Sequence, residues 1–402
     1  MKGPLAGIRI CDMTRVLAGP YCTMVLADMG AEVIKIEKPG SGDDTRKWGP
    51  PFINGHSYYF LSINRNKKSL AVDVATKSGR KIIYELSKKS DVFIENFVPE
   101  KLDSMSLGYN AISKVNPQII YCSLTGYGSR GPDKLLPGYD LMASAIGGGM
   151  HITGRKDGRP MRHGVATTDI LTGLYAHSAI IAALYERTLS GKGKKIDCSL
   201  LQSQIASMHS HASSYLNANQ STTRMGTEHP NISPYQAFDA KDGCFVIAAA
   251  NDKHFRSLCH TLELSDIAMD GRFITNPKRV ENRDILTNII QEKISEHSMD
   301  YWIHRLEENG VPCGPVNDIG QTYEQPMVKN RIQEFDDPIY GHLRLPGPAV
   351  DFEYEDFGEG TSIPSPPPLL GEHTRKVLQD VLNFDAPQIQ DLLDRKVIQA
   401  PT

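Results

Sequence analysis

Residues 7–37 read GIRICDMTRVLAGPYCTMVLADMGAEVIKIE, and this stretch decides the fold class. The apolar run 7–13, with its β-branched residues, is typical of a buried strand. A helical pattern over 21–30 ends at Gly30, and 31–37 is a second β-branched run. Glycine is common just past a helix end. Strand, helix and strand in this order predict a βαβ unit with two parallel strands.

The same alternation continues along the chain. Further strands are predicted over 69–74, 91–96, 118–124 and 194–200, and helices over 79–88, 169–187 and 201–216. Strands that alternate with helices form a parallel sheet covered on both faces. We therefore predict a large, doubly wound (Rossmann-like) α/β domain.

The sequence changes in character near residue 220. A polar segment, 217–234, precedes a predicted β-hairpin over 235–250 that turns at 241–243. The remaining predictions are helices at 252–263 and 280–310, an extended segment at 337–352, a proline cluster at 364–368, and helices from about 372 and 386. The hairpin and the helices after it indicate a second, smaller α+β domain.

Composition narrows the class of function. The chain has 402 residues, of which 40% are hydrophobic, and its 44 Lys and Arg against 47 Asp and Glu give a net charge of −3. A nearly neutral chain without a basic block gives no reason to expect nucleic acid or a membrane surface as a partner. Seven widely spaced cysteines without a C-x-x-C pair predict free thiols in a reducing compartment. Because a strand begins by Ile8, no signal peptide is expected, and we predict a cytoplasmic location, or the mitochondrial matrix if a presequence is not included.

Several chemical motifs are missing from the sequence. It contains no G-x-G-x-x-G, no G-x-x-x-x-G-K-[ST], no H-E-x-x-H and no G-x-S-x-G. The sequence therefore gives no motif-based support for nucleotide binding of these types, metalloprotease activity or α/β-hydrolase activity. His209 and His211 are two residues apart, so on a helix they point to different faces. No metal site is predicted.

Asp169 has two readings from its sequence context. It follows two threonines and precedes a long apolar helix, which is the usual setting of a helix N-cap. The alternative is a carboxylate nucleophile that the helix dipole keeps ionised and that attacks an activated acyl group. Lys38 and Arg46, in the glycine-rich loop after the second strand, are either solvated loop charges or, in the case of Lys38, a phosphate contact.

A set of motifs runs through the whole chain in order. They lie at residues 4–46, 64–73, 91–99, 124–132, 138–140, 168–169, 191–201, 310–318 and 367–374. With these motifs the sequence resembles the class III CoA-transferases, a family that also has α-methylacyl-CoA racemase among its more distant relatives. The resemblance favours the nucleophile over the helix cap for Asp169.

The resemblance implies a reaction and a set of site residues. Asp169 attacks the thioester of an acyl-CoA donor, and a mixed anhydride and then an aspartyl-CoA thioester follow before CoA passes to a carboxylic acid acceptor. CoA thioesters are substrates, and no permanently bound cofactor is implied. The implied CoA-binding residues are Val16, Leu17, Lys38, Val72, Asn96 and Phe97, with Tyr139 and Asp140 facing the nucleophile.

Departures from the family pattern favour particular members. Racemases have a histidine where this chain has Tyr139, and tyrosine is a poor base at neutral pH. Formyl-CoA transferases have a glutamine in place of Leu17. CoA transfer is therefore predicted, with a racemase or a non-catalytic CoA-binding protein as alternatives.

Other stretches resemble the members that use succinyl-CoA and glutarate. They lie at residues 14–20, 40–46, 48–52, 64–69, 151–154 and 234–238. The acceptor is then a dicarboxylate such as glutarate, whose second carboxylate needs a cation. Arg162, Arg224 and His229 are the candidates, and solvated loop charges are the alternative for all three.

The family resemblance also implies an architecture. It places a large CoA-binding domain at 1–200, a linker at 201–224, a small domain at 225–318, a linker at 319–345, and a return to the large domain at 346–402. The implied assembly is an interlocked homodimer. Sequence patterns support the two domains and say nothing about the interlocking.

Overall fold

The computed structural model describes residues 3–352 and 364–401, which divide into two units. The first unit comprises Met1–Gly149, His163–Gln220 and Asn330–Thr402, and the second comprises Met150–Arg162 and Ser221–Lys329. These bounds differ from the predicted ones at several places. Residues 201–220, predicted to belong to a linker, are part of the first unit and are helical at 201–207 and 209–218, and residues 150–162, predicted inside the large domain, belong to the second.

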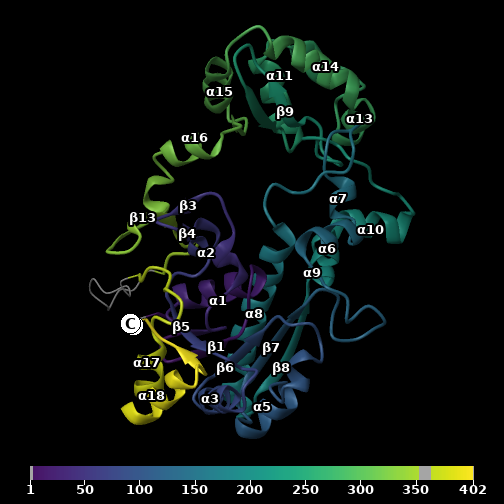
Figure 1. The fold of residues 1–402 in the computed structure, drawn as a ribbon. Coiled ribbons are helices and arrows are strands. Elements are labelled where there is room, and N and C mark those ends of the chain that lie inside the picture. The colour runs from purple at the N-terminus through teal and green to yellow at the C-terminus, as the bar shows by residue number, and fades with distance from the viewer. Residues whose placement is uncertain (1–2, 353–363, 402) are drawn as a thin grey trace. The chain divides into compact units, whose positions relative to one another are not determined.

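The first unit is built on a seven-stranded sheet with the order β14-β5-β2-β1-β6-β7-β8 (Figure 1). The strands are β1 (Arg9–Asp12), β2 (Glu32–Glu37), β5 (Lys67–Val72), β6 (Val92–Glu95), β7 (Ile120–Thr125), β8 (Lys194–Ser199) and β14 (Ile398–Gln399). Neighbouring strands are parallel except for β14, which runs antiparallel to β5. The six parallel strands match the predicted ones, whereas the two-residue β14 was not predicted because it is too short to have a pattern.

Helices cover both faces of the sheet, as predicted. Alternate residues of a strand point to opposite faces, so Ile10 packs with α1 (Ala18–Asp28) and α8 (Thr167–Ser190), while Cys11 packs with α3 (Lys77–Lys88) and α18 (Ala386–Asp394). This is the doubly wound α/β arrangement. Its strands end at one edge of the sheet, where such folds bind their ligands.

Shorter elements complete the first unit. They are β3 (Phe52–Ile53), β4 (His56–Ser57), α2 (Tyr58–Ser62), α4 (Lys101–Ser104), α5 (Tyr109–Val115), α6 (Asp140–Ile146), α9 (Leu200–Ser207), α10 (His209–Ala218), β12 (Ile332–Asp337), β13 (Gly341–Pro346) and α17 (Thr374–Lys376). The antiparallel pair β12 and β13 accounts for part of the extended segment predicted at 337–352. Residues 364–368, the proline cluster, are irregular.

The second unit has a three-stranded sheet of its own. Its order is β11-β10-β9, with β9 (Tyr235–Asp239) and β10 (Cys244–Ala248) forming the predicted hairpin and β11 (Cys313–Pro315) at the edge. Its helices are α11 (Asp252–Thr261), α12 (Ser265–Met269), α13 (Asn276–Glu281), α14 (Arg283–Ile294), α15 (Met299–Glu308) and α16 (Ile319–Glu324), and α7 (Gly149–Ile152) begins at the boundary between the units.

The single helix predicted over 280–310 was wrong. Three helices occupy 276–308, and Ser298 begins the last of them by accepting a hydrogen bond from the backbone N–H of Tyr301. Serine is a favoured N-cap residue, which is why the helical pattern is interrupted there. Within residues 3–352 and 364–401, every helix is too short or too polar to span a bilayer.

Candidate active site

A cavity of about 190 Å³ opens where the chain direction across the sheet reverses, at the carboxyl ends of β1 and β6. From β1 the chain continues to β2 on one side, and β6 adjoins β1 on the other. Open α/β sheets bind ligands at this switch point because the loops after the two strands separate there. The lining residues are Arg15, Val16, Leu17, Ala18, Asp44, Asn96, Phe97, Val98, Pro99, Leu124, Thr125, Gly126, Leu136, Pro137, Gly138, Tyr139, Asp169 and Leu200.

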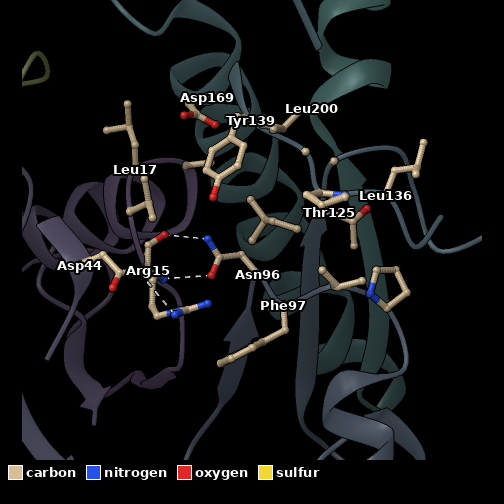
Figure 2. Close-up of a pocket in the computed structure, with 18 residues that line it drawn as sticks. Arg15, Leu17, Asp44, Asn96, Phe97, Thr125, Leu136, Tyr139, Asp169 and Leu200 are labelled. Atoms are coloured by element: carbon tan, nitrogen blue, oxygen red, sulfur yellow. Dashed lines mark hydrogen bonds and ion pairs between the residues drawn. The ribbon is translucent and has the colours of Figure 1, made fainter. Parts of the chain in front are cut away.

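Two hydrogen bonds join the loops after β1 and β6. The side chain of Asn96 accepts from the backbone N–H of Arg15 at 2.9 Å and donates to the backbone carbonyl of Arg15 at 2.7 Å (Figure 2). The Arg15 guanidinium lies 5.1 Å from the centre of the Phe97 ring. One wall of the cavity is therefore formed by two loops that hydrogen bonds hold together.

Asp169 enters the cavity from the first turn of α8. Helix α8 begins at Thr167, so Asp169 is its third residue, and the N-cap position is occupied by Ala166, which makes no side-chain cap. The cap comes from another element. The carboxylate of Asp140 accepts from the backbone N–H groups of Thr168, at 2.9 Å, and Asp169, at 3.3 Å. The interpretation of Asp169 as a helix cap is thus wrong. Asp140 caps α8, and the Asp169 side chain lines the cavity.

The pKa of Asp169 differs from the expectation of a carboxylate kept ionised by the helix dipole. Burial raises the pKa of Asp169 from 3.8 to about 7, and the negative charge of Asp140 adds to the rise. These two effects outweigh the stabilisation that a helix N-terminus gives to an anion. Asp169 consequently titrates near neutral pH, and its carboxylate is more basic, hence a stronger nucleophile, than an ordinary one.

Two glycines fix the segment that holds Tyr139 and Asp140. A Cβ atom on Gly138 would lie 2.2 Å from the Cα of Gly126, so the loop after β7 and the start of α6 touch backbone to backbone. Tyr139 is 61% exposed, and in Figure 2 its hydroxyl end points toward the side of the cavity formed by Arg15 and Asn96. The contact between Gly126 and Gly138 fixes the segment in which Tyr139 lines the cavity and Asp140 contacts the start of α8.

The structure brings together most, but not all, of the residues predicted from the sequence. Six line the cavity, namely Val16, Leu17, Asn96, Phe97, Tyr139 and Asp169. Asp140 contacts the start of α8 through the hydrogen bonds described above. Lys38 is exposed and lies outside the lining, and Val72 is buried in the hydrophobic core, where β5 pairs with β14. Arg46 is held by Glu37 through two bonds of 2.8 and 2.6 Å, so it is neither a free loop charge nor a cavity residue.

Sequence reasoning missed several residues around the cavity. Thr125 is the last residue of β7, and Arg15, Val98, Pro99 and Leu136 lie in the segments after parallel strands, which is a signal that could have found them. It also missed two buried charges next to the loop after β1, Lys35 and Asp43. The signal for Lys35 was a lysine between the apolar residues Ile34 and Ile36 of β2, because strands of parallel sheets are normally hydrophobic in their middle.

The candidates for a second carboxylate lie in or beside the second unit. Arg224 donates from Nε to the backbone carbonyl of Gly158, at 2.9 Å, and from Nη1 to that of His151, at 3.0 Å. His229 accepts at Nδ1 from the backbone N–H of Asn231. Arg162 is exposed. Arg224 is thus committed in part to the turn between residues 151 and 158. Across residues 3–352 and 364–401, no three His, Cys, Asp or Glu side chains are grouped so that they could hold a metal ion.

Comparison with known proteins assigns the chain to a family. The model of CoA-transferase family III matches residues 5–374, and the chain belongs to this family. Its acyl-CoA thioester substrates follow from membership. The chain is 48% identical over 398 residues to succinyl-CoA:glutarate CoA-transferase of Mus musculus, covering 98% of this chain and 90% of the mouse protein. The Homo sapiens protein of the same name is 47% identical over 397 residues, with the same coverage.

A solved structure supports the fold. A CAIB/BAIF family protein from Brucella suis has a TM-score of 0.82 and 39% sequence identity, and the match covers 95% of this chain and all of that one. The α/β architecture and the predicted transferase class are both confirmed.

Proposed function

We propose that this CoA-transferase moves CoA from succinyl-CoA to glutarate through covalent intermediates on Asp169. The position of Asp169 carries the proposal: it is the only carboxylate at the start of α8 whose side chain lines the cavity among the described residues. The substrates rest on the two relatives at 47 and 48% identity, whose names state succinyl-CoA and glutarate.

The first half-reaction forms the aspartyl thioester. A carboxylate oxygen of Asp169 attacks the thioester carbonyl of succinyl-CoA, the C–S bond breaks, and the products are a succinyl–aspartyl anhydride and CoA thiolate. The thiolate then attacks the side-chain carbonyl of Asp169, which releases succinate and leaves CoA bound to Asp169. No proton has to be transferred, because carboxylate and thiolate exchange their charges.

The second half-reaction repeats these steps in reverse with glutarate. A glutarate carboxylate attacks the aspartyl thioester, which gives a glutaryl–aspartyl anhydride and CoA thiolate. Attack of the thiolate on the glutaryl carbonyl yields glutaryl-CoA and restores the Asp169 carboxylate. Both anhydrides conserve the energy of the thioester only if water is excluded, and the half-buried position of Asp169 contributes to this exclusion. No other cofactor is needed for these steps.

The CoA contacts belong to the same proposal. Val16, Leu17, Asn96, Phe97 and Tyr139 line the cavity with Asp169 and are proposed to contact the donor. Lys38, which is exposed outside the cavity, is proposed to contact a part of CoA that extends beyond it. Val72 is buried in the core and is not proposed as a contact.

We also propose a homodimer, with subunits interlocked as the family resemblance implies, and a reducing, cytoplasmic environment. Apolar side chains exposed on α6 and α8 support an interface; they are Leu141, Met142, Ile146, Leu174, Tyr175, Tyr185 and Leu189. All seven cysteines are free, which supports the reducing compartment. Light scattering on the purified protein tests the dimer.

The proposed reaction is tested by mass spectrometry of the acyl-CoA products. The protein is mixed with succinyl-CoA and, in separate reactions, glutarate, malate, oxalate, carnitine and itaconate. Glutaryl-CoA is expected with the intact protein and not with Asp169→Ala. Incorporation of solvent deuterium at the α-carbon of a branched acyl-CoA, without acylation of any acceptor, would instead establish a racemase. Binding of CoA without either reaction would indicate a non-catalytic protein.

A further inference from the structure

The loop that follows β1 is held by side chains at every polar backbone group from the N–H of Thr14 to the N–H of Val16. Asp12 accepts from the Thr14 N–H at 2.9 Å, and Lys35 donates to the Thr14 carbonyl at 2.9 Å. Asn96 holds both groups of Arg15, and Asp43 accepts from the Val16 N–H at 3.3 Å from each carboxylate oxygen. Met13, the first residue after β1, donates its N–H to the Ile94 carbonyl of β6, and these four side chains hold the loop from there to Val16.

Val16 adopts a backbone conformation that valine normally avoids. Its φ is +70°, in the left-handed region. A β-branched residue is a genuine outlier there, because its Cβ crowds the backbone. Such a conformation persists only where surrounding contacts enforce it, and it is typical of functional sites. Val16 lines the cavity with Asp169, so the outlier lies at the proposed site.

A buried ion pair supplies the enforcing contacts. The Nζ of Lys35 lies 2.9 Å from the Asp43 carboxylate, and both side chains are 0% exposed. The same Nζ holds the Thr14 carbonyl, so the pair contacts the loop on both sides of Arg15. The pKa of Asp43 is about 2, despite burial, because Lys35 and hydrogen bonds from Thr45 favour the carboxylate. The pKa of Lys35 is raised by Asp43, Asp12 and Glu37, so the pair stays charged.

The burial of this pair, Lys35 in β2 and Asp43 in the loop after it, is not explained by stability. A buried ion pair is often no more stabilising than apolar residues of the same size, because the cost of removing two charges from water offsets their attraction. Lys35 shares its face of β2 with Val33, and apolar residues of α1 cover that face. An apolar side chain at this position could not hold the Thr14 carbonyl or balance the charge of Asp43, whose carboxylate accepts from the Val16 N–H.

We propose that Lys35 and Asp43 are positioning residues that lock the Val16 loop in the conformation that binds CoA. This inference rests on the proposed donor site, and the pair acts through Val16 without touching the substrate. The pair pre-organises the cavity wall, so the free-energy cost of ordering the Val16 loop is met when the protein folds and not when CoA binds. Its loss is expected to weaken CoA binding more than the covalent steps on Asp169.

The variant Asp43→Asn tests the inference by isothermal titration calorimetry with CoA. We expect the Kd for CoA and the KM for succinyl-CoA to rise about tenfold, the ratio that corresponds to one lost charge-assisted hydrogen bond. We expect kcat at saturating donor to change less than about threefold. The peptide that contains residues 14–17 should exchange its amide hydrogens faster in the variant.

A matched control separates positioning from stability. Asp28→Asn breaks the buried pair of Asp28 and Arg65, whose atoms are 2.5 Å apart at the other end of α1. It should lower the Tm to a similar extent and leave the Kd for CoA unchanged. If Asp43→Asn does not fold, the double variant Lys35→Met with Asp43→Leu replaces it, because it removes both charges and leaves neither one buried alone.

The strain at Val16 provides a second, independent readout. Glycine adopts a positive φ without the Cβ penalty. The effect of Asp43→Asn on the Kd for CoA should therefore be smaller in a Val16→Gly background than in the native one, which a double-mutant cycle measures.

Four results bear on the outcome. A Kd for CoA in Asp43→Asn within twofold of the native value, or equal rises in Asp43→Asn and Asp28→Asn, overturns the inference. Native protein that binds no CoA refutes the proposed function instead, and the exchange of residues 14–17 then decides the inference by itself. Unchanged exchange in the variant would show that the pair does not hold the loop.

Discussion

Replacing the proposed nucleophile should stabilise the protein while abolishing its activity. Asp169→Asn retains the size of the side chain but has no charge to bury. The folded protein disfavours the ionised Asp169, whose pKa is raised from 3.8 to about 7. The native protein therefore binds a proton that the unfolded chain has released between these two pH values, and its stability falls as the pH rises through this range.

The magnitude follows from the shift. Each pKa unit corresponds to about 1.4 kcal/mol, so the difference between 3.8 and about 7 gives an upper limit of about 4 kcal/mol for the cost of ionised Asp169. The partial exposure of the side chain reduces this, and we expect roughly 2 to 4 kcal/mol. The advantage of Asp169→Asn over the native protein should be small near pH 4, grow by up to about 1.4 kcal/mol per pH unit, and level off above pH 7.

Differential scanning calorimetry of both proteins at pH 5, 6, 7 and 8 measures this difference. The Tm of Asp169→Asn should exceed that of the native protein by a few degrees at pH 8 and by clearly less at pH 5. Glutaryl-CoA formation by the same samples should be lost. A Tm difference that does not depend on pH, or a native protein more stable than the variant at pH 8, would refute the assignment of a buried, destabilised carboxylate to this position.

Three further predictions concern the same site. The kcat/KM for the donor should rise with pH to a plateau, with a midpoint near 7, because the carboxylate form of Asp169 reacts. Asp140→Asn should move this midpoint to lower pH, since the variant removes a negative charge beside Asp169 and keeps an acceptor for the α8 backbone. Gly126→Ala should lower kcat/KM at least tenfold, because its Cβ would lie 2.5 Å from the Cα of Gly138, whereas Gly271→Ala, with open space around it, should have no effect. Burial raises the pKa of Glu95 to about 7, and the Glu95 carboxyl accepts a hydrogen bond from the Phe97 N–H at 2.9 Å. Glu95→Gln keeps this acceptor, so calorimetry should give a Kd for CoA close to that of the native protein. Glu95→Ala removes the acceptor and should bind CoA clearly more weakly.

The parallel sheet could be predicted because its signals are local. Each buried strand is a short β-branched run, and each run is separated from the next by a helical pattern, so order and type follow from the sequence. The hairpin at 235–248 was found for the same reason. The helix predicted over 280–310 failed because the stop at Ser298 depends on a cap that the apolar pattern does not reveal.

The candidate site was likewise predicted only in part from the sequence. Asp169 was found through a whole-chain resemblance, while its local context favoured a helix cap. Its freedom from capping depends on Asp140, which is 29 residues away in the chain. Lys38 was predicted as a phosphate contact because it lies in a glycine-rich loop, yet it lies outside the cavity, and Lys35, which was not predicted, holds the Thr14 carbonyl beside it.

The sequence by itself determined the doubly wound fold and the transferase class and led to Asp169 as the proposed nucleophile, because strand and helix periodicity and the order of the motifs are local properties of the chain. Only the tertiary structure showed the raised pKa of Asp169, the left-handed conformation of Val16 and the buried pair of Lys35 and Asp43 beside it. These properties depend on burial and on charges and hydrogen bonds between residues that are distant in sequence. Sequence spacing does not specify such contacts; the packing of β1, β2, β6, α6 and α8 around one edge of the sheet does.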